Sequence, residues 1–240
     1  MFITYNCITN PTAINCSRYI TCYVPQLSIA AGILPATSVV VVNEKSQDGE
    51  IVVTNTDNYP VLLTTELVNV DPEYQDLVIA TPQLIRVEPK AKQLIRFMLT
   101  SNSNLKHEVL MRVIFEGIPP QADPDAEQIK FTIRQNLPLI IKPKNLPEND
   151  TPWELLKWKY EKNTLIVTNP SPYIVRLSNS VLSKPGNIEW VLPSNYILPN
   201  QSIELTTSQR SPTLIDGVTI QPFTQWGYST TQKYSIKLNN

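Results

Sequence analysis

The chain has 240 residues, of which 42% are hydrophobic, enough for two ordinary domains that each bury a core. Its 21 prolines against 6 glycines argue against long helices, because proline removes a backbone donor and disrupts helix interiors. The formal net charge of −1 argues against the strongly basic surface that nucleic acids and anionic membranes attract.

Residues 1–30 differ in composition from the rest of the chain. They contain no acidic residue and a single basic one, Arg18, after which the chain is largely apolar. The triplet Ser28-Ile29-Ala30 has the small-x-small pattern of a signal-peptidase site, which predicts a secretory signal cleaved after Ala30. Because Pro25 interrupts the apolar run, a start that is misassigned or unfolded is the other interpretation.

From Val39 onward the apolar and β-branched residues follow the short period of β-strands. The segments expected in the first half are 39–42, 50–54, 61–67, 93–97 and 109–115. A second unit begins after 142–147, with expected strands at 164–168, 173–177, 202–205 and 234–238. Short strands at this spacing predict an all-β chain of two immunoglobulin-like β-sandwich domains, 31–144 and 145–240.

Residues 127–142 form the most informative segment. It begins with clean alternation, since Ile129, Phe131 and Ile133 share one face and polar side chains share the other. It is too long for one ordinary strand. Either it is the last strand of the first domain, with these side chains in that domain's own core, or part of it lies at an edge and offers its apolar row to another protein.

Short motifs follow one another in a fixed order along residues 31–240. They are Val53-Thr54-Asn55, Ala80-Thr81-Pro82, Arg86-Val87-Glu88-Pro89, Phe115-Glu116-Gly117-Ile118-Pro119-Pro120, Lys142-Pro143 and Asn169-Pro170-Ser171-Pro172-Tyr173. In this order they resemble the PapD-like periplasmic pilus-assembly chaperones of chaperone–usher systems.

The resemblance implies a boomerang of two immunoglobulin-like domains that acts in the periplasm, without a cofactor and without enzymatic activity. The expected client is a fimbrial subunit whose own fold lacks its last strand. Ile129, Phe131 and Ile133 would fill the gap by donor-strand complementation, and the subunit would pass to an outer-membrane usher. An exposed apolar edge also makes the free chaperone prone to cap itself as a dimer.

The sequence lacks the two cationic residues that, in the family, bind the client's terminal carboxylate. The family's Arg follows an Ala-Thr pair, and Ser38 stands at that position here. The family's Lys aligns with Pro138. Arg134 and Lys142 are therefore candidate carboxylate anchors, and the other interpretation is that both are ordinary solvated charges.

The resemblance also implies an ion network between the domains, formed by Arg96, Glu108 and Asp216. In the family such residues fix the interdomain geometry. The alternative is that these are independent surface charges, which stabilise a protein little.

The residues required for several other functions are missing. His107 is the one histidine, and no Gly-x-Ser-x-Gly elbow, metal-ligand spacing or phosphate-binding glycine motif occurs. The only cysteines, Cys7, Cys16 and Cys22, precede Ala30. The competing functions are a structural or adhesive protein of tandem immunoglobulin-like domains and a carbohydrate-binding module, which would use tryptophans of the second domain: Trp153, Trp158, Trp190 and Trp226.

Overall fold

The computed structural model describes residues 32–74, 76–100, 104–120, 132–224, 227–230 and 232–238. The predicted signal at residues 1–30, the donor residues Ile129 and Phe131, and Trp226 lie outside this described part. The described chain is built of β-strands and two short 3₁₀ helices, η1 (Pro72–Tyr74) and η2 (Pro152–Leu155). Neither helix is long or apolar enough to cross a membrane.

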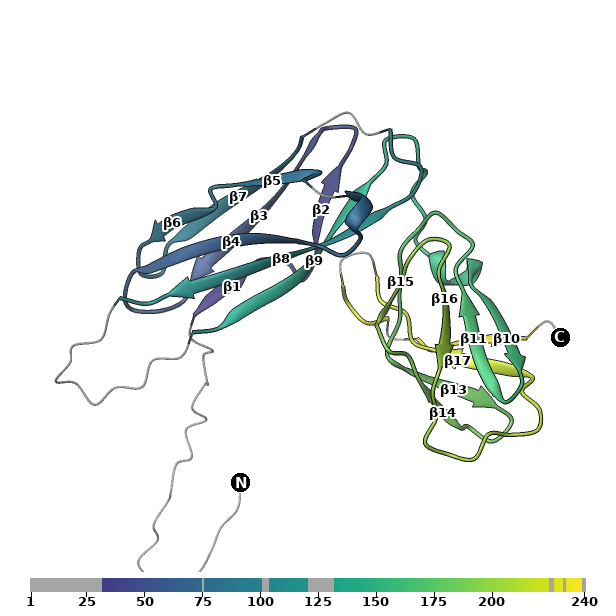
Figure 1. The fold of residues 1–240 in the computed structure, drawn as a ribbon. Coiled ribbons are helices and arrows are strands. Elements are labelled where there is room, and N and C mark those ends of the chain that lie inside the picture. The colour runs from purple at the N-terminus through teal and green to yellow at the C-terminus, as the bar shows by residue number, and fades with distance from the viewer. Residues whose placement is uncertain are drawn as a thin grey trace, which may run out of the picture. The chain divides into compact units, whose positions relative to one another are not determined.

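The first domain is a β-sandwich (Figure 1). One layer holds β5, β7, β3 and β1, and the other holds β2, β9, β8, β4 and β6, with a single β2–β3 pair, Asn43 with Asp48, joining them. The strands are β1 (Ile33–Pro35), β2 (Val40–Asn43), β3 (Asp48–Asn55), β4 (Val61–Asn69), β5 (Val78–Thr81), β6 (Leu84–Val87), β7 (Lys92–Leu99), β8 (Val109–Ile118) and β9 (Arg134–Lys142).

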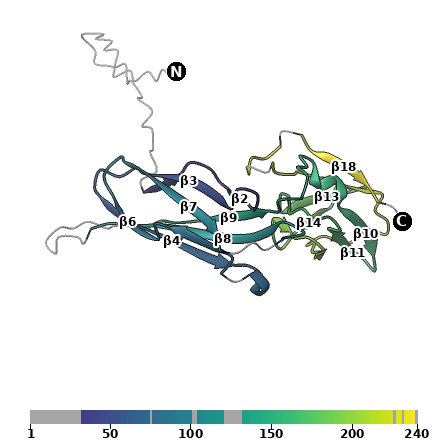
Figure 2. The same ribbon diagram turned by 90° about the horizontal axis from the view of Figure 1, so that it is seen from above.

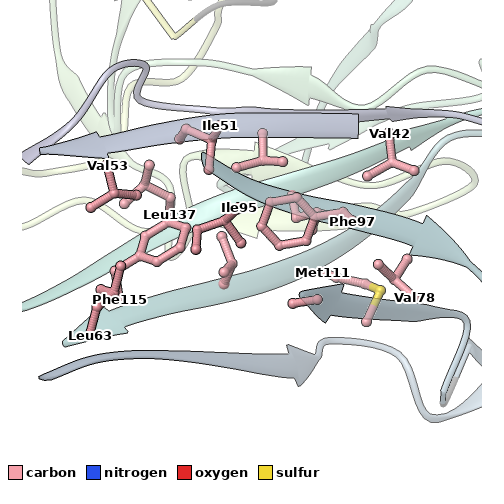
Figure 3. Close-up of a cluster of buried hydrophobic side chains, with 14 of the residues drawn as sticks. Val42, Ile51, Val53, Leu63, Val78, Ile95, Phe97, Met111, Phe115 and Leu137 are labelled. Atoms are coloured by element: carbon pink, nitrogen blue, oxygen red, sulfur yellow. The ribbon is translucent and has the colours of Figure 1, made fainter. Parts of the chain in front are cut away.

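The core of this domain lies between the two layers (Figure 3). Alternate residues of each strand point inward, as Ile51 and Val53 do from β3 and as Ile95 and Phe97 do from β7. Phe97 and Phe115 are the largest side chains with no solvent exposure here. Burial of such side chains stabilises the sandwich by about 1.5–3 kcal/mol each.

The second domain has its own core, which includes Trp153, Trp158 and Trp190. Its sheets are β10-β11-β16, β12-β15 and β14-β13-β17-β18, of which Figure 2 gives a second view. The strands are β10 (Lys157–Glu161), β11 (Thr164–Thr168), β12 (Val175–Arg176), β13 (Ser180–Lys184), β14 (Glu189–Val191), β15 (Tyr196–Ile197), β16 (Ser202–Leu205), β17 (Gly217–Ile220) and β18 (Tyr234–Lys237).

The prediction of an all-β chain of two immunoglobulin-like domains is confirmed, with differences in detail. Segment 173–177 forms only the two-residue strand β12, because Tyr173 and Ile174 belong to a turn and a domain contact. The strand expected from residue 127 begins, in the described part, at Arg134.

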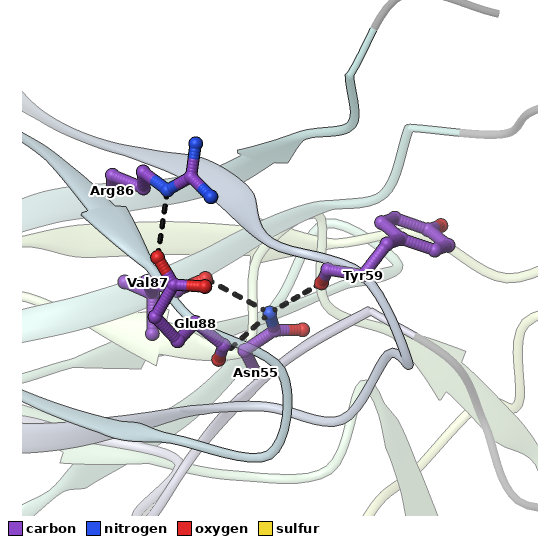
Figure 4. Close-up of polar contacts among 5 residues, drawn as sticks. All are labelled: Asn55, Tyr59, Arg86, Val87 and Glu88. Atoms are coloured by element: carbon purple, nitrogen blue, oxygen red, sulfur yellow. Dashed lines mark hydrogen bonds and ion pairs between the residues drawn. The ribbon is translucent and has the colours of Figure 1, made fainter.

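A buried asparagine fixes a turn in each domain. The Asn55 side chain is fully enclosed, and its Nδ2 donates to the carbonyl oxygens of Tyr59 at 2.9 Å, Val87 at 3.1 Å and Glu88 at 3.2 Å (Figure 4). In the second domain Asn169 Nδ2 donates in the same way to Tyr173 at 2.7 Å. Buried polar groups need hydrogen-bond partners. These two side-chain amides supply partners for turn carbonyl groups that are not paired within the sheets, and they thereby hold the turns in place.

We predict that Asn55→Ala lowers the free energy of unfolding by about 2–4 kcal/mol, because it leaves several backbone groups without partners. Asn69→Ala, at an exposed position of β4, should change it by less than ~0.5 kcal/mol. Urea unfolding of both variants measures the difference. Equal stabilities would mean that the amide of Asn55 does not fix the turn.

Candidate functional site

The last strand of the first domain, β9, has a different partner on each edge. On one edge it pairs antiparallel with β8 from Arg134 to Ile141. On the other edge it pairs in parallel with β2, from Leu139 to Lys142 only. Between Arg134 and Pro138 this second edge has no strand partner among the described residues. An edge of this kind offers backbone donors and acceptors to an added strand.

The inward-facing side chains of β9 are buried along most of the strand but become exposed near its start. Leu137, Leu139 and Ile141 are buried in the core of the first domain. Two-residue alternation puts Ile133 in the same row, yet its side chain is 46% exposed. The predicted donor residue Ile133 therefore lies at the accessible end of the strand, next to the open edge.

The end of β9 is fixed by the buried side chain of Glu44. Glu44 Oε1 accepts from the backbone N–H of Leu105 at 3.1 Å, and Oε2 accepts from that of Lys144 at 2.9 Å. The N–H of Glu44 in turn donates to the carbonyl of Lys142 at 2.9 Å. A carboxylate that accepts backbone hydrogen bonds of this kind holds the exit of β9 in place.

The two candidate anchor residues, Arg134 and Lys142, lie in different surroundings. Arg134 Nη2 pairs with Glu66 at 2.9 Å, and its Nε pairs with Glu116 at 3.4 Å, so its charge is already balanced at the surface. Lys142 instead lines a cavity together with Glu108 and Trp153.

A cavity of about 520 Å³ opens beside Ser38 and Pro138, the positions at which the sequence analysis expected cations and found none. Ser38 and Pro138 line it, as do Arg112 from β8 and Arg176 from β12. Pro138 is paired in register with Arg112, so the two side chains share one face of the sheet. Neither arginine was predicted from the sequence, because their approach to Ser38 and Pro138 depends on strand pairing and domain packing.

The Arg176 guanidinium is held by aromatic rings. It lies 4.9 Å from the ring centroid of Tyr196 and 5.4 Å from that of Phe223. Its Nε and Nη1 are enclosed and have no hydrogen-bond partner. Burial lowers the pKa of Arg176 from its ordinary value, Tyr196 opposes this effect, and the like charge of Arg112 lowers the pKa further.

None of the ion pairs between described residues joins Arg96, Glu108 and Asp216, the three residues of the predicted ion network. Arg96 and Asp216 are both exposed, on β7 and just before β17. Glu108 alone reaches the second domain: its N–H donates to the Pro172 carbonyl at 2.9 Å, and its Oε2 accepts from the Ile174 N–H at 2.7 Å.

The contact between the domains is completed by apolar side chains. Val39, Leu110 and Ile140 of the first domain form a buried cluster with Ile174 and Tyr196 of the second. Their neighbours Val40, Val109 and Ile141 point instead into the core of the first domain. The strands are therefore apolar on both faces where the domains meet.

Three of the four tryptophans are core residues: Trp153, Trp158 and Trp190 are each no more than 5% exposed. They cannot form a platform for sugar stacking. Among the described residues no cluster of His, Cys, Asp and Glu suits a metal ion. His107 hydrogen-bonds the Tyr74 hydroxyl at 3.3 Å and the Glu108 carbonyl at 3.1 Å.

Comparison with known proteins agrees with this fold. Residues 32–147 match the N-terminal domain of PapD, described as a pili and flagellar-assembly chaperone, and residues 151–234 match the C-terminal domain of the pili assembly chaperone PapD. The chain belongs to the PapD-like family of pilus-assembly chaperones.

Among its relatives is the uncharacterized fimbrial chaperone YhcA of Escherichia coli K12, which is 34% identical over 84% of this chain and 88% of its own. The chaperone protein SefB of Salmonella enteritidis is 28% identical over 70% of this chain and 72% of its own. The solved complex of the SafA pilin with the SafB chaperone of Salmonella enterica has the same fold. Its match has a TM-score of 0.72, 20% identity, and coverage of 88% of this chain and 98% of the other.

Glu108 is expected to make stability depend on pH. Burial raises its pKa above the ordinary 4.5, although the Ile174 N–H and Lys142 oppose the shift. The folded state then binds this proton more tightly than the unfolded state does. Its contribution to the free energy of unfolding therefore falls as pH rises from about 4.5 through the folded pKa.

Glu108→Gln replaces the titrating carboxyl group with an amide, which keeps an oxygen to accept from the Ile174 N–H. We predict that the variant gains stability relative to the parent protein as pH rises through that window, measured by urea unfolding at several pH values. Glu204→Gln, at an exposed position of β16, controls for the lost charge. Parallel stability curves for Glu108→Gln and the parent would contradict the assignment.

Proposed function

We propose that this protein is a periplasmic chaperone that captures fimbrial subunits by adding its own strand to their incomplete fold. The open edge of β9 between Arg134 and Pro138, next to the exposed Ile133, is the observation that carries the proposal. Membership of the pilus-assembly chaperone family supports it, as do relatives that are named fimbrial chaperones.

The energetics suit such capture. A subunit that lacks a strand has an apolar groove bordered by unpaired backbone groups, which invites aggregation. The edge of β9 supplies backbone partners, while Ile129, Phe131 and Ile133 supply apolar side chains. Each buried side chain contributes roughly 1.5–3 kcal/mol before ordering costs are subtracted. A better-fitting strand from another subunit can then displace the chaperone without an added energy source.

The protein is exported to the periplasm and delivers its client to the outer membrane. Residues 1–30 act as a secretory signal, residues 31–144 form the domain that carries the donor strand, and residues 145–240 form the second domain. The captured subunit is released to an outer-membrane usher. The free protein can cap its own edge by dimerising, because an unpaired strand edge accepts any compatible strand.

The competing interpretation, a structural or adhesive surface protein, uses the same fold differently. It leaves the open edge of β9 and the exposed Ile133 without a role. The relatives are chaperones, which also favours capture.

Ile133→Lys tests the proposal. The side chain is 46% exposed, so the variant should stay folded, with a free energy of unfolding within ~0.5 kcal/mol of the parent. Affinity for a co-expressed fimbrial subunit should fall about 10- to 100-fold, because the buried isoleucine is replaced by a charge. Binding is measured by titration of the purified proteins.

Leu84→Lys is the matched control. Leu84 is also an exposed apolar residue, 58% accessible, but it begins β6 at the far border of the same sheet. This variant should bind the subunit as the parent does. Equal binding by Ile133→Lys and the parent would remove the donor strand from the mechanism.

A further inference from the structure

The outward face of β9 carries a charged side chain where the strand has its open edge. Because Leu137 points into the core, two-residue alternation puts Arg134 and Asn136 on the other face of the sheet. The Arg134 guanidinium is the centre of two ion pairs, since Nη2 lies 2.9 Å from Glu66 Oε2 and Nε lies 3.4 Å from Glu116 Oε2. We call these three charged residues the Arg134 triad. Strand addition at the open edge does not by itself require them.

The Arg134 triad joins three neighbouring strands, β4, β8 and β9 (Figure 1). Arg134 stands directly opposite Glu116 in the register of β9 with β8. Glu66 lies on β4, opposite Ile114, which is two residues from Glu116 along β8. The Arg134 side chain therefore crosses β8 diagonally to reach β4. A guanidinium suits this span, because its planar fork can donate to two carboxylates at once, whereas a lysine ammonium acts as a point charge.

A second side-chain link holds the same stretch of β9. Arg112 of β8 donates from Nε to the side-chain oxygen of Asn136 at 2.8 Å and from Nη2 to its backbone oxygen at 2.9 Å. Both links fall between Arg134 and Pro138, where β9 has β8 as its one hydrogen-bonded neighbour among the described strands. Side chains thus hold the segment that lacks a second strand.

The strength of these contacts fits a local role. The side chains of the Arg134 triad are between 27% and 56% exposed, and an exposed ion pair shifts an equilibrium by at most about fivefold. Such a pair changes the stability of a whole domain little. The opening of a strand end costs much less free energy than global unfolding, so two such pairs can decide whether the strand end is ordered. Ile133 adds little to this order, since its side chain is 46% exposed.

The Arg134 triad leaves the capture surface free. It lies on the outward face of the sheet, while Ile133 and Leu137 belong to the opposite face and the open edge lies in the plane of the sheet. A client strand can therefore add to the edge without displacing the ion pairs. A donor strand that is already extended loses less conformational entropy when the client binds, which raises the affinity.

We propose that the Arg134 triad positions the donor strand, by holding residues 133–138 extended against β8 before a subunit arrives. The proposal rests on the proposed function, because it takes this strand to be the one that subunits bind. Arg134 is then a positioning residue, which acts on the strand through Glu66 and Glu116 and does not contact the client.

The first test measures amide hydrogen exchange in the full-length protein without a subunit. Arg134→Glu places a third carboxylate beside Glu66 and Glu116, so we expect exchange in residues 132–138 to accelerate about three- to tenfold, while exchange in 139–142 stays unchanged. Arg134→Gln, which removes the charge without adding repulsion, should give a smaller change in the same direction. In about 1 M NaCl the same segment of the parent should also exchange faster, because salt screens exposed charges. Equal exchange in the parent and Arg134→Glu would overturn the proposal.

The second test measures capture of a co-expressed fimbrial subunit by titration of the purified proteins. Arg134→Glu should weaken binding about three- to tenfold, because the disordered strand end must be ordered on binding. Exchanging the two charges, in the double variant Arg134→Glu/Glu116→Arg, should restore the affinity to within about twofold of the parent. The cation introduced on β8 again lies between two carboxylates, one on β4 and one on β9.

The charge exchange separates positioning from direct contact. If Arg134 itself bound the client, the double variant would carry the wrong charge at position 134 and would bind as weakly as Arg134→Glu. That result would overturn the proposal, as would normal capture by Arg134→Glu. Lys159→Glu, which breaks an exposed ion pair with Glu161 in the second domain, is the control and should bind as the parent does. A loss as large as that of Arg134→Glu would make the effect one of net charge and would also overturn the proposal.

The two proposals fail in different ways. If donor-strand capture is wrong, Ile133→Lys binds the subunit normally, while Arg134→Glu still speeds exchange in residues 132–138 of the free protein. If the positioning role is wrong, Ile133→Lys weakens capture, while Arg134→Glu leaves exchange in this segment unchanged or the charge exchange fails to restore binding.

Discussion

The strand β9 gains a second hydrogen-bonding partner after Pro138, and the functional part of the molecule is organised around this change. From Leu139 onward the strand lies between β8 and β2 and is an interior strand of its sheet. Before Pro138 it has β8 on one side only among the described strands. Proline suits the boundary, because it has no N–H to offer a neighbour. The same strand thus holds its domain together at one end and is available to another chain at the other.

The contact between the domains explains the apolar runs around this strand. Val39–Val42 and the end of β9 are apolar without alternation, because one set of side chains enters the first core and the other set meets Ile174 and Tyr196. A strand that is buried on both faces has no solvent-facing side, so its residues can be apolar without alternation. The junction is completed by Glu108, whose hydrogen bonds to residues 172–174 fix the approach of the second domain to β8.

Much of the fold could be predicted from the sequence, because period-two alternation and turn motifs are local signals. Segments such as 61–67 and 109–115 appear as β4 and β8 nearly as expected. Short strands such as β1 and β15 give too few residues for a period to be recognised. The sequence placed Ile133 in an apolar row longer than one strand but left open whether its side chain is buried, and the structure shows it exposed.

The approach of Arg112 and Arg176 to the cavity could not be predicted in this way, because it depends on long-range geometry. Arg112 faces Pro138 only through the β8–β9 register, and Arg176 reaches Ser38 only through the packing of the second domain. Arg134 and Lys142 were the candidates on the sequence, and the ion pairs of Arg134 with Glu66 and Glu116 on neighbouring strands were likewise not visible there. The partner of Glu108 was equally hard to foresee, since its carboxylate accepts from a backbone N–H, that of Ile174.

Amide hydrogen exchange along β9 tests the central claim most directly. The free protein is compared with its complex with a co-expressed fimbrial subunit, by mass spectrometry of peptides that cover residues 132–138 and 139–142. An added strand at the open edge predicts that exchange in 132–138 slows by about tenfold or more on binding, while 139–142, already paired on both edges, changes little. Unchanged exchange in 132–138 in a fully formed complex would contradict the account.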